Sequence, residues 1–110
     1  MAYDEELAER IRQALDGEPG LTEKRMFGGL AFLVGGNMAV AASGQGGLLL
    51  RCDPAEADTL TSGPHVQRMQ MRGRDMDGWL RVDSPALDSA AALGRWVEVG
   101  VAYARSLPAK

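Results

Sequence analysis

Apolar residues along this chain recur with two different periods, one typical of helices and the other of strands. Residues 4–16 follow the helical period, with Leu7, Ile11 and Leu15 on one stripe behind an acidic start at Asp4. Strand-like runs separated by glycine-rich turns follow at residues 24–34, 37–43 and 47–52. Short turns between consecutive strands predict antiparallel hairpins.

The next segment begins with a strong helix-start signal. Asp53 is a good N-cap, Pro54 suits the first helical position, and Glu56 occupies the capping-box position. These residues predict a short helix that ends before Gly63. A further hairpin is expected from residues 66–72 and 75–82, turning at Gly73-Arg74.

A long helix is predicted at the end of the sequence. Ser84-Pro85 opens a helical start, Asp88 is a second candidate cap, and the helical pattern continues to about Leu107. The resulting element order is α-β-β-β-α-β-β-α. With short connections throughout, this order predicts a single α+β domain over residues 1–110, in which helices pack on one antiparallel sheet.

Gly28 and Gly29 interrupt the first predicted strand directly behind Phe27. A glycine pair inside a β-forming run is expected at a bulge or bend, or where another backbone approaches closely. We therefore expect a structural role for both glycines, through a positive φ or through lack of space above Cα.

Composition and charge narrow the class of protein. The chain is 45% hydrophobic and 25% charged, which is typical of a globular domain, and its net charge of −3 argues against general nucleic-acid affinity. Cys52 is the only cysteine, so no intrachain disulfide is possible. The acidic N-terminus does not resemble a signal peptide, and no apolar run approaches the ~20 residues of a membrane span. We expect a cytoplasmic protein that does not enter the membrane.

Side chains suited to catalysis are few. His65 is the only histidine, and Cys52, at a predicted strand end, is expected to be a small buried hydrophobe. The two together do not make a typical zinc site, and Gly44-Gln45-Gly46-Gly47 lacks the ending of a phosphate-binding loop. We expect no catalytic residues, no cofactor and no metal. The alternative is a small-molecule-binding or enzymatic domain with a cleft near His65 and Cys52.

Basic residues are the best candidates for binding. They lie on predicted strands or turns, at Lys24, Arg25, Arg51, Arg68, Arg72, Arg74 and Arg81. If several share one sheet face, they form a patch for phosphate or an acidic partner. A nucleic-acid-associated accessory factor is therefore an alternative function, although we expect the isolated domain to bind nucleic acid weakly or not at all. The other interpretation is that these charges protect strand edges from aggregation.

The C-terminal helix is more apolar than packing on one sheet requires. Trp96, Val99 and Tyr103 belong to an apolar arc of about 200°, whereas a sheet-packed helix needs only ~100° or somewhat more. Residues 30–34 and 38–42 are also apolar at both alternating faces, and Gly94 and Gly100 would admit a close backbone. We therefore expect a homodimer through this helix. The alternative is that the first helix and the chain's own loops cover it.

Several motifs together resemble the TfoX (Sxy) N-terminal domain family. They are Lys24-Arg25-Met26-Phe27-Gly28-Gly29, the hairpin around Asn37-Met38, Leu50-Arg51 with Asp53, Gly78-Trp79-Leu80-Arg81-Val82, and Ala102-Tyr103-Ala104-Arg105-Ser106-Leu107-Pro108. Met26, Phe27, Gly28, Gly29, Gly78 and Trp79 form its structural part.

The resemblance implies a secretion-chaperone-like α+β fold and no catalytic residues. Full-length family members regulate natural competence with a transcription activator and carry a second, C-terminal domain. We expect a non-enzymatic regulatory or interaction module with an unknown protein partner.

Overall fold

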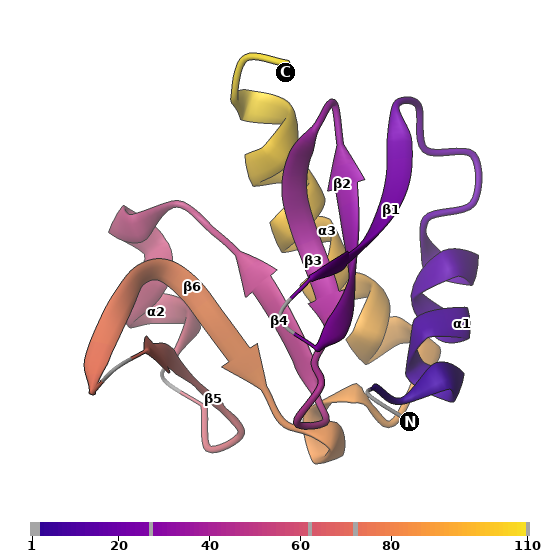
Figure 1. Ribbon diagram of the computed structural model, residues 1–110. Helices are drawn as coiled ribbons and strands as arrows, with labels where there is room; N and C mark the ends of the chain where they lie inside the picture. The colour runs from indigo at the N-terminus through magenta and orange to yellow at the C-terminus, as the bar shows by residue number, and fades with distance from the viewer. Residues whose placement is uncertain (1–2, 27, 62, 72, 110) are drawn as a thin grey trace.

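The computed structural model describes residues 3–26, 28–61, 63–71 and 73–109, and it is an α+β structure built on one six-stranded sheet (Figure 1). The elements are α1 (Glu5–Ala14), β1 (Leu21–Met26), β2 (Gly29–Val34), β3 (Asn37–Ala42), β4 (Leu48–Arg51), the 3₁₀ turn η1 (Pro54–Glu56), α2 (Ala57–Leu60), β5 (Val66–Met71), β6 (Arg74–Val82), the 3₁₀ turn η2 (Ser84–Leu87) and α3 (Ala90–Ser106). All neighbouring strands pair antiparallel, in the order β1-β2-β3-β4-β6-β5. The predicted fold class is confirmed.

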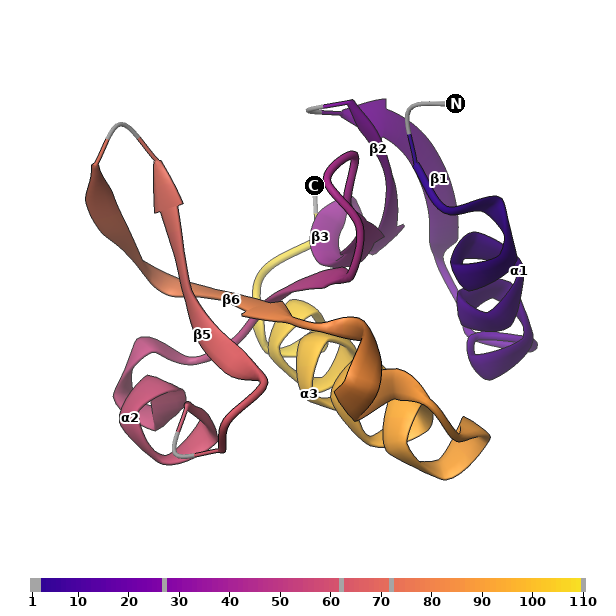
Figure 2. The ribbon, with the colours of Figure 1, turned by 90° about the horizontal axis from the view of Figure 1, so that it is seen from below.

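The main hydrophobic core lies between the sheet and the helices. Strand side chains such as Phe32, Leu50 and Leu80 are fully buried there against Ile11 of α1 and Val101 of α3. Figure 2 shows α2 and α3 on the same side of β6, and the apolar cluster on the other face of the sheet contains strand residues only. The helices therefore cover only one face of the sheet.

The prediction of one strand over residues 24–34 is wrong, because this segment forms two strands joined by a tight turn. Lys24 pairs with Ala31, so β1 and β2 form a hairpin across the glycine pair. Gly28 has φ +76°, and a Cβ added to Gly29 would lie 2.2 Å from the Ala42 carbonyl oxygen. Gly28 thus has the expected positive φ, and Gly29 has the expected lack of space above its Cα. Phe27 lies outside the described residues.

Helix starts follow the sequence signals with one correction. The Asp53 carboxylate accepts a hydrogen bond from the Ala55 N–H at 2.9 Å, as expected of a cap. Asp88 is not the cap of the last helix. Ser89 is, because its hydroxyl accepts from the Ala92 N–H at 3.0 Å. The helix begins after η2, which takes up the segment opened by Ser84-Pro85.

A Gly29→Ala substitution is expected to destabilise the protein by about 1–3 kcal/mol, because the new Cβ meets backbone that does not yield easily. Gly94 is the matched control, since an added Cβ there meets nothing within 4 Å inside α3. Gly94→Ala should raise stability by roughly 0.5–1 kcal/mol through helix propensity. Urea unfolding measures both, and equal effects of the two changes would contradict the close contact at Gly29.

Candidate functional site

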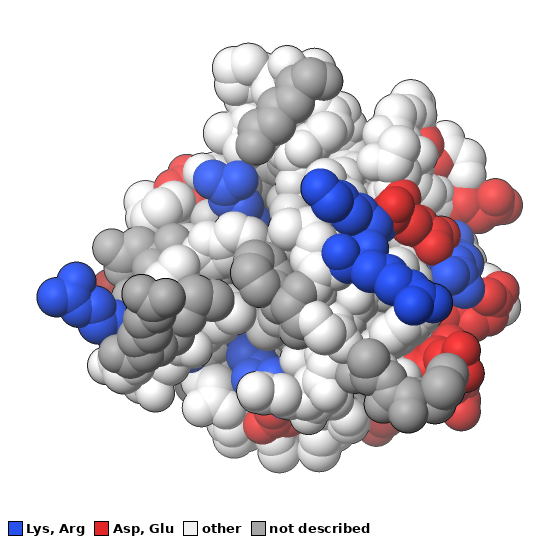
Figure 3. Space-filling model, in the orientation of Figure 1, with Lys and Arg blue, Asp and Glu red and all other residues white. Residues whose placement is uncertain are grey.

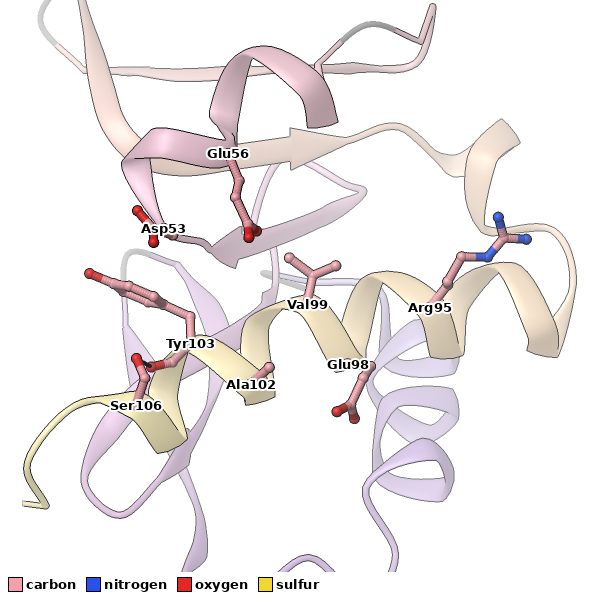
Figure 4. A pocket seen from close by; sticks show the side chains of 8 residues that line it. All are labelled: Asp53, Glu56, Arg95, Glu98, Val99, Ala102, Tyr103 and Ser106. Atoms are coloured by element: carbon pink, nitrogen blue, oxygen red, sulfur yellow. Dashed lines mark hydrogen bonds between the residues drawn. The ribbon is translucent and has the colours of Figure 1, made fainter.

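A groove runs along α3, between this helix and the η1–α2 segment. One part is a cavity of about 470 Å³ lined by Asp53, Glu56, Arg95, Glu98, Val99, Ala102, Tyr103 and Ser106. Figure 4 shows Glu56 pointing from η1 toward Val99 and Tyr103 pointing from α3 toward Asp53. The second part, of about 440 Å³, is lined by Thr59, Leu60, Gly63, Val66, Ala86, Ala92, Arg95, Trp96 and Val99. The two parts share Arg95 and Val99, so we call them together the α3 groove.

The apolar arc of α3 is divided between two surroundings. Five residues of α3 face the sheet and α1 and are buried: Leu93, Val97, Gly100, Val101 and Ala104. Trp96 and Val99 are half-buried against the edge of the same core and line the groove. A Cβ on Gly100 would lie 2.4 Å from the Ala39 carbonyl oxygen, so the backbone that this glycine admits belongs to the chain's own β3. The chain's own elements therefore cover much of the arc, and the groove is what they leave open.

Polar character differs between the two parts of the groove. Asp53, Glu56 and Glu98 line the 470 Å³ part, and Arg95 is the only base among its described lining residues. The other part is mainly apolar, because Leu60, Val66 and Trp96 line it. The groove thus combines an apolar floor with an acidic end.

Arg51 lies between the groove and the opposite face of the sheet. Its guanidinium carbon is 5.5 Å from the centre of the Trp79 ring and 5.4 Å from that of Tyr103. These distances are within the range of cation–π attraction. Neither ring neutralises the charge, so Arg51 remains a fixed positive group.

The predicted basic residues do not form one cluster. Lys24 and Arg25 lie on the edge strand β1, whereas Arg68 lies on the opposite edge strand β5, where it pairs with Asp58. Arg74 is exposed at the start of β6, and Arg72 lies outside the described residues. The strand register nevertheless places Lys24, Arg51 and Arg81 on the same face of the sheet, the one without helices.

Arg81 has a structural role within this set. It donates hydrogen bonds to the Gln45 and Gly46 carbonyls, at 3.1 and 2.6 Å, and to the Ser43 hydroxyl at 3.2 Å. These contacts fix the turn between β3 and β4. The nearest described carboxylate is that of Asp83, 3.8 Å away.

His65 and Cys52 do not converge on a common cleft. The Cys52 N–H bonds to the Gly78 carbonyl, while the His65 carbonyl accepts from the Asp83 N–H. Gly78 on β6 and Asp83, directly after this strand, are five residues apart, which is roughly 16 Å at ~3.3 Å per residue. Cys52 is 1% exposed, in line with the expected buried hydrophobe. Among the residues that the structure describes, no three His, Cys, Asp or Glu side chains could hold a metal ion, and no helix is long and apolar enough to cross a membrane.

Two features of the site were missed from the sequence. The wall of the groove opposite α3 comes from η1 and α2, and their position beside α3 depends on the path of the chain after β4. Met69 and Trp79 join a second apolar cluster on the face without helices, together with Ala31, Ala41 and Leu49. The double-sided apolar pattern of residues 30–34 and 38–42 was the available signal for this cluster.

The burial of the Cys52 thiol, directly after β4, can be tested through the pH dependence of stability. Burial raises the pKa of this thiol above the usual value, and the carboxylates of Glu56 and Asp53 add to the effect. The unfolded chain therefore loses the thiol proton first as the pH rises, so the free energy of unfolding should fall between about pH 8 and 10. Urea unfolding should show a steeper fall for the wild type than for Cys52→Ala. Parallel curves would mean that the thiol titrates normally in the folded protein.

Comparison with known proteins gives one match. The family model of the TfoX N-terminal domain matches residues 5–104, which is nearly the whole chain. No curated protein and no solved structure matches. The match includes β1, Gly78-Trp79 on β6, and α3 as far as Ala104, so it covers the motifs on which the resemblance was based except residues 105–108. The chain belongs to the TfoX N-terminal domain family.

Proposed function

We propose that this protein is a non-enzymatic regulatory module that acts by binding other protein chains, and that it pairs with a second copy of itself along α3. Membership of a regulatory family supports the first part. The α3 groove is the observation that carries the second, because it leaves Trp96, Val99 and Tyr103 half-exposed beside one another. Open apolar surface of this kind is typical of interaction sites.

Pairing of two copies follows from the position of the groove. It runs along a helix of 17 residues, so a partner helix can lie beside α3 over several turns. Two-fold symmetry would place each α3 against the same surface of the other copy, which is the commonest arrangement of small homodimers. Ala102 is exposed in the middle of this surface and offers no steric barrier.

The enzymatic alternative has less support. Cys52 is hydrogen-bonded to Gly78 in the middle of β6, whereas His65 is hydrogen-bonded to Asp83, directly after the end of β6. A nucleophile needs a base within hydrogen-bond reach, and the geometry of this pair does not provide one. A role in catalysis therefore has no candidate residues among those that the sequence suggested.

The pairing proposal is tested by light scattering and sedimentation at tens of micromolar protein. The wild type should have twice the 11.7 kDa mass of one chain. Ala102→Glu places a fourth carboxylate among Asp53, Glu56 and Glu98 in the groove, and it should weaken pairing at least about tenfold by like-charge repulsion. Ala91→Glu is the matched control, since Ala91 is an exposed alanine of α3 that lines neither part of the groove. A monomeric wild type, or an equal effect of both changes, would contradict the proposal.

We further predict that the isolated protein binds duplex DNA weakly or not at all at physiological salt. The net charge is −3, and the predicted basic residues are spread over opposite edges of the sheet and do not form one cluster. Fluorescence anisotropy with a labelled duplex checks this at several salt concentrations. Sub-micromolar binding that weakens steeply with salt would instead favour the accessory-factor alternative.

A further inference from the structure

The side of α3 that lines the groove is a regular stripe centred on Val99. Glu98 also lines the groove, but Figure 4 shows its side chain pointing away from η1. The other lining residues lie three, four and seven positions before and after Val99, which is the spacing of one helix face. None of them is buried in the chain. The stripe consists of Ala92, Arg95, Trp96, Val99, Ala102, Tyr103 and Ser106.

Charge is distributed unevenly along this stripe. Arg95 lies before Val99, is exposed, and makes no hydrogen bond or ion pair with any residue that the structure describes. Asp53 and Glu56 lie over the other half of the stripe. Figure 4 shows Asp53 beside Tyr103 and Glu56 above Val99, with Arg95 at the opposite end of the view. The groove therefore has a basic end and an acidic end.

The acidic end is open to a positive group from outside. The guanidinium of Arg51 lies 5.4 Å from the centre of the Tyr103 ring, but Arg51 is not among the described residues that line the groove. One Asp53 oxygen accepts the Ala55 N–H, and a carboxylate has further acceptor sites. Glu56 makes no hydrogen bond or ion pair within the described part of the chain.

A two-fold axis could relate two α3 helices in a parallel or an antiparallel way. In a parallel pair, like positions meet, so Arg95 would face Arg95 and Trp96 would face Trp96. In an antiparallel pair centred on Val99, each residue meets the one that lies equally far beyond Val99. Four residues rise about 6 Å along a helix, so Arg95 of one copy comes level with Tyr103 of the other.

The antiparallel arrangement matches unlike groups at each level of the stripe. Arg95 reaches the end of the other copy's groove where Asp53 and Glu56 lie. Trp96, the largest side chain of the stripe, meets the exposed Ala102. A large residue opposite a small one lets two helices pack closely, whereas the parallel arrangement sets two indoles and two guanidiniums against each other.

We infer that two copies pair with their α3 helices antiparallel and centred on Val99, and that Arg95 of each copy forms an ion pair with Glu56 and Asp53 of the other. This inference rests on the proposed pairing and adds its orientation and the charges that select it. By two-fold symmetry the ion pair occurs twice. Because these groups are exposed in the free chain, added salt weakens their attraction.

The orientation is tested with single cysteines in a Cys52→Ala chain and a short bis-maleimide cross-linker. Ala92 and Ser106 lie seven residues from Val99 on opposite sides. In the antiparallel pair, position 92 of one copy is level with position 106 of the other, whereas the two positions 92 are roughly 21 Å apart along the helices. A mixture of Ala92→Cys and Ser106→Cys chains should therefore cross-link mainly between unlike chains, as the intact mass of the product shows.

Two other results of this experiment are distinguishable. A product that joins mainly two Ala92→Cys chains would mean parallel helices, and it would overturn the inference while leaving the pairing itself intact. A wild type that sediments as a monomer at tens of micromolar would remove the pairing and the inference together.

Charge reversal tests the ion pairs. Arg95→Glu and Glu56→Arg should each weaken pairing about tenfold or more, because each change puts like charges opposite one another. An equal mixture of the two variants should pair within about threefold of the wild type, since every charge then meets its opposite. A mixture that pairs no better than the separate variants would contradict the inference.

Arg74→Glu is the matched control for charge. Arg74 is exposed at the start of β6 and lines neither part of the groove. Figure 3 looks onto the sheet, with α3 behind it, and shows Lys and Arg on this side in separate groups. The control should change pairing less than about twofold, because its charge is screened from the groove. An effect equal to that of Arg95→Glu would mean a general response to net charge.

Salt provides an independent measurement on the wild type. Between about 0.05 and 0.5 M sodium chloride, pairing should weaken severalfold because the ion pairs are screened. Burial of apolar surface alone is not weakened by salt. Pairing that is unchanged or tighter at high salt would contradict a role of Arg95 and Glu56.

Discussion

The contact between α3 and β3 is the constraint on which the rest of the structure depends. Gly100 lies directly against the backbone of β3, where an added Cβ would be 2.4 Å from the Ala39 carbonyl oxygen and 2.8 Å from Cγ1 of Val40. Only a residue without a side chain allows this spacing. Because the helix lies so close, Val97, Val101 and Ala104 are buried, and the neighbouring face of α3 turns toward η1 and α2. The same placement puts the helices on one side of the sheet, and the second apolar cluster on the other side is formed by strand residues alone.

A second glycine fixes the wall that faces α3. Gly78 has φ +79°, and a Cβ there would be 2.9 Å from the Cys52 carbonyl oxygen and 3.2 Å from Pro54 Cγ. The end of β4 and the start of η1 therefore pack directly on β6. Since only Asp53 separates Cys52 from η1, this contact also places Asp53 and Glu56 at the groove. The conformation of one glycine on β6 thus determines the acidic end of a groove formed mainly by another element.

Local signals in the sequence were enough for most elements and too weak for some boundaries. The acidic helix start at Asp4, the cap at Asp53, the hairpin of residues 66–82 and the long last helix all follow from short-range chemistry. The glycine pair at residues 28 and 29 was ambiguous, because a bulge and a two-strand turn both call for glycine. Asp88 and Ser89 are both good caps, and only the preceding 3₁₀ turn decides between them.

The surfaces required information that no local signal contains. Helical periodicity places Trp96, Val99 and Tyr103 on one side of α3, but the groove also needs the path of η1 and α2. Likewise, the basic residues could be located on strands, whereas their separation depends on the strand order, which puts β1 and β5 at opposite edges. Pairwise register then brings Lys24, Arg51 and Arg81 to one face despite their distance in sequence.

Net charge is a poor guide to partners of a domain built in this way. The molecule measures 32 × 31 × 28 Å, while the Debye length at physiological ionic strength is about 8 Å. A partner at one face is therefore screened from most charges of the opposite face. The total of −3 combines carboxylates on α1 and along the α3 groove with Lys24, Arg51 and Arg81 on the face of the sheet without helices. The charge near a given face, and not the sum over the chain, therefore decides which partners that face attracts.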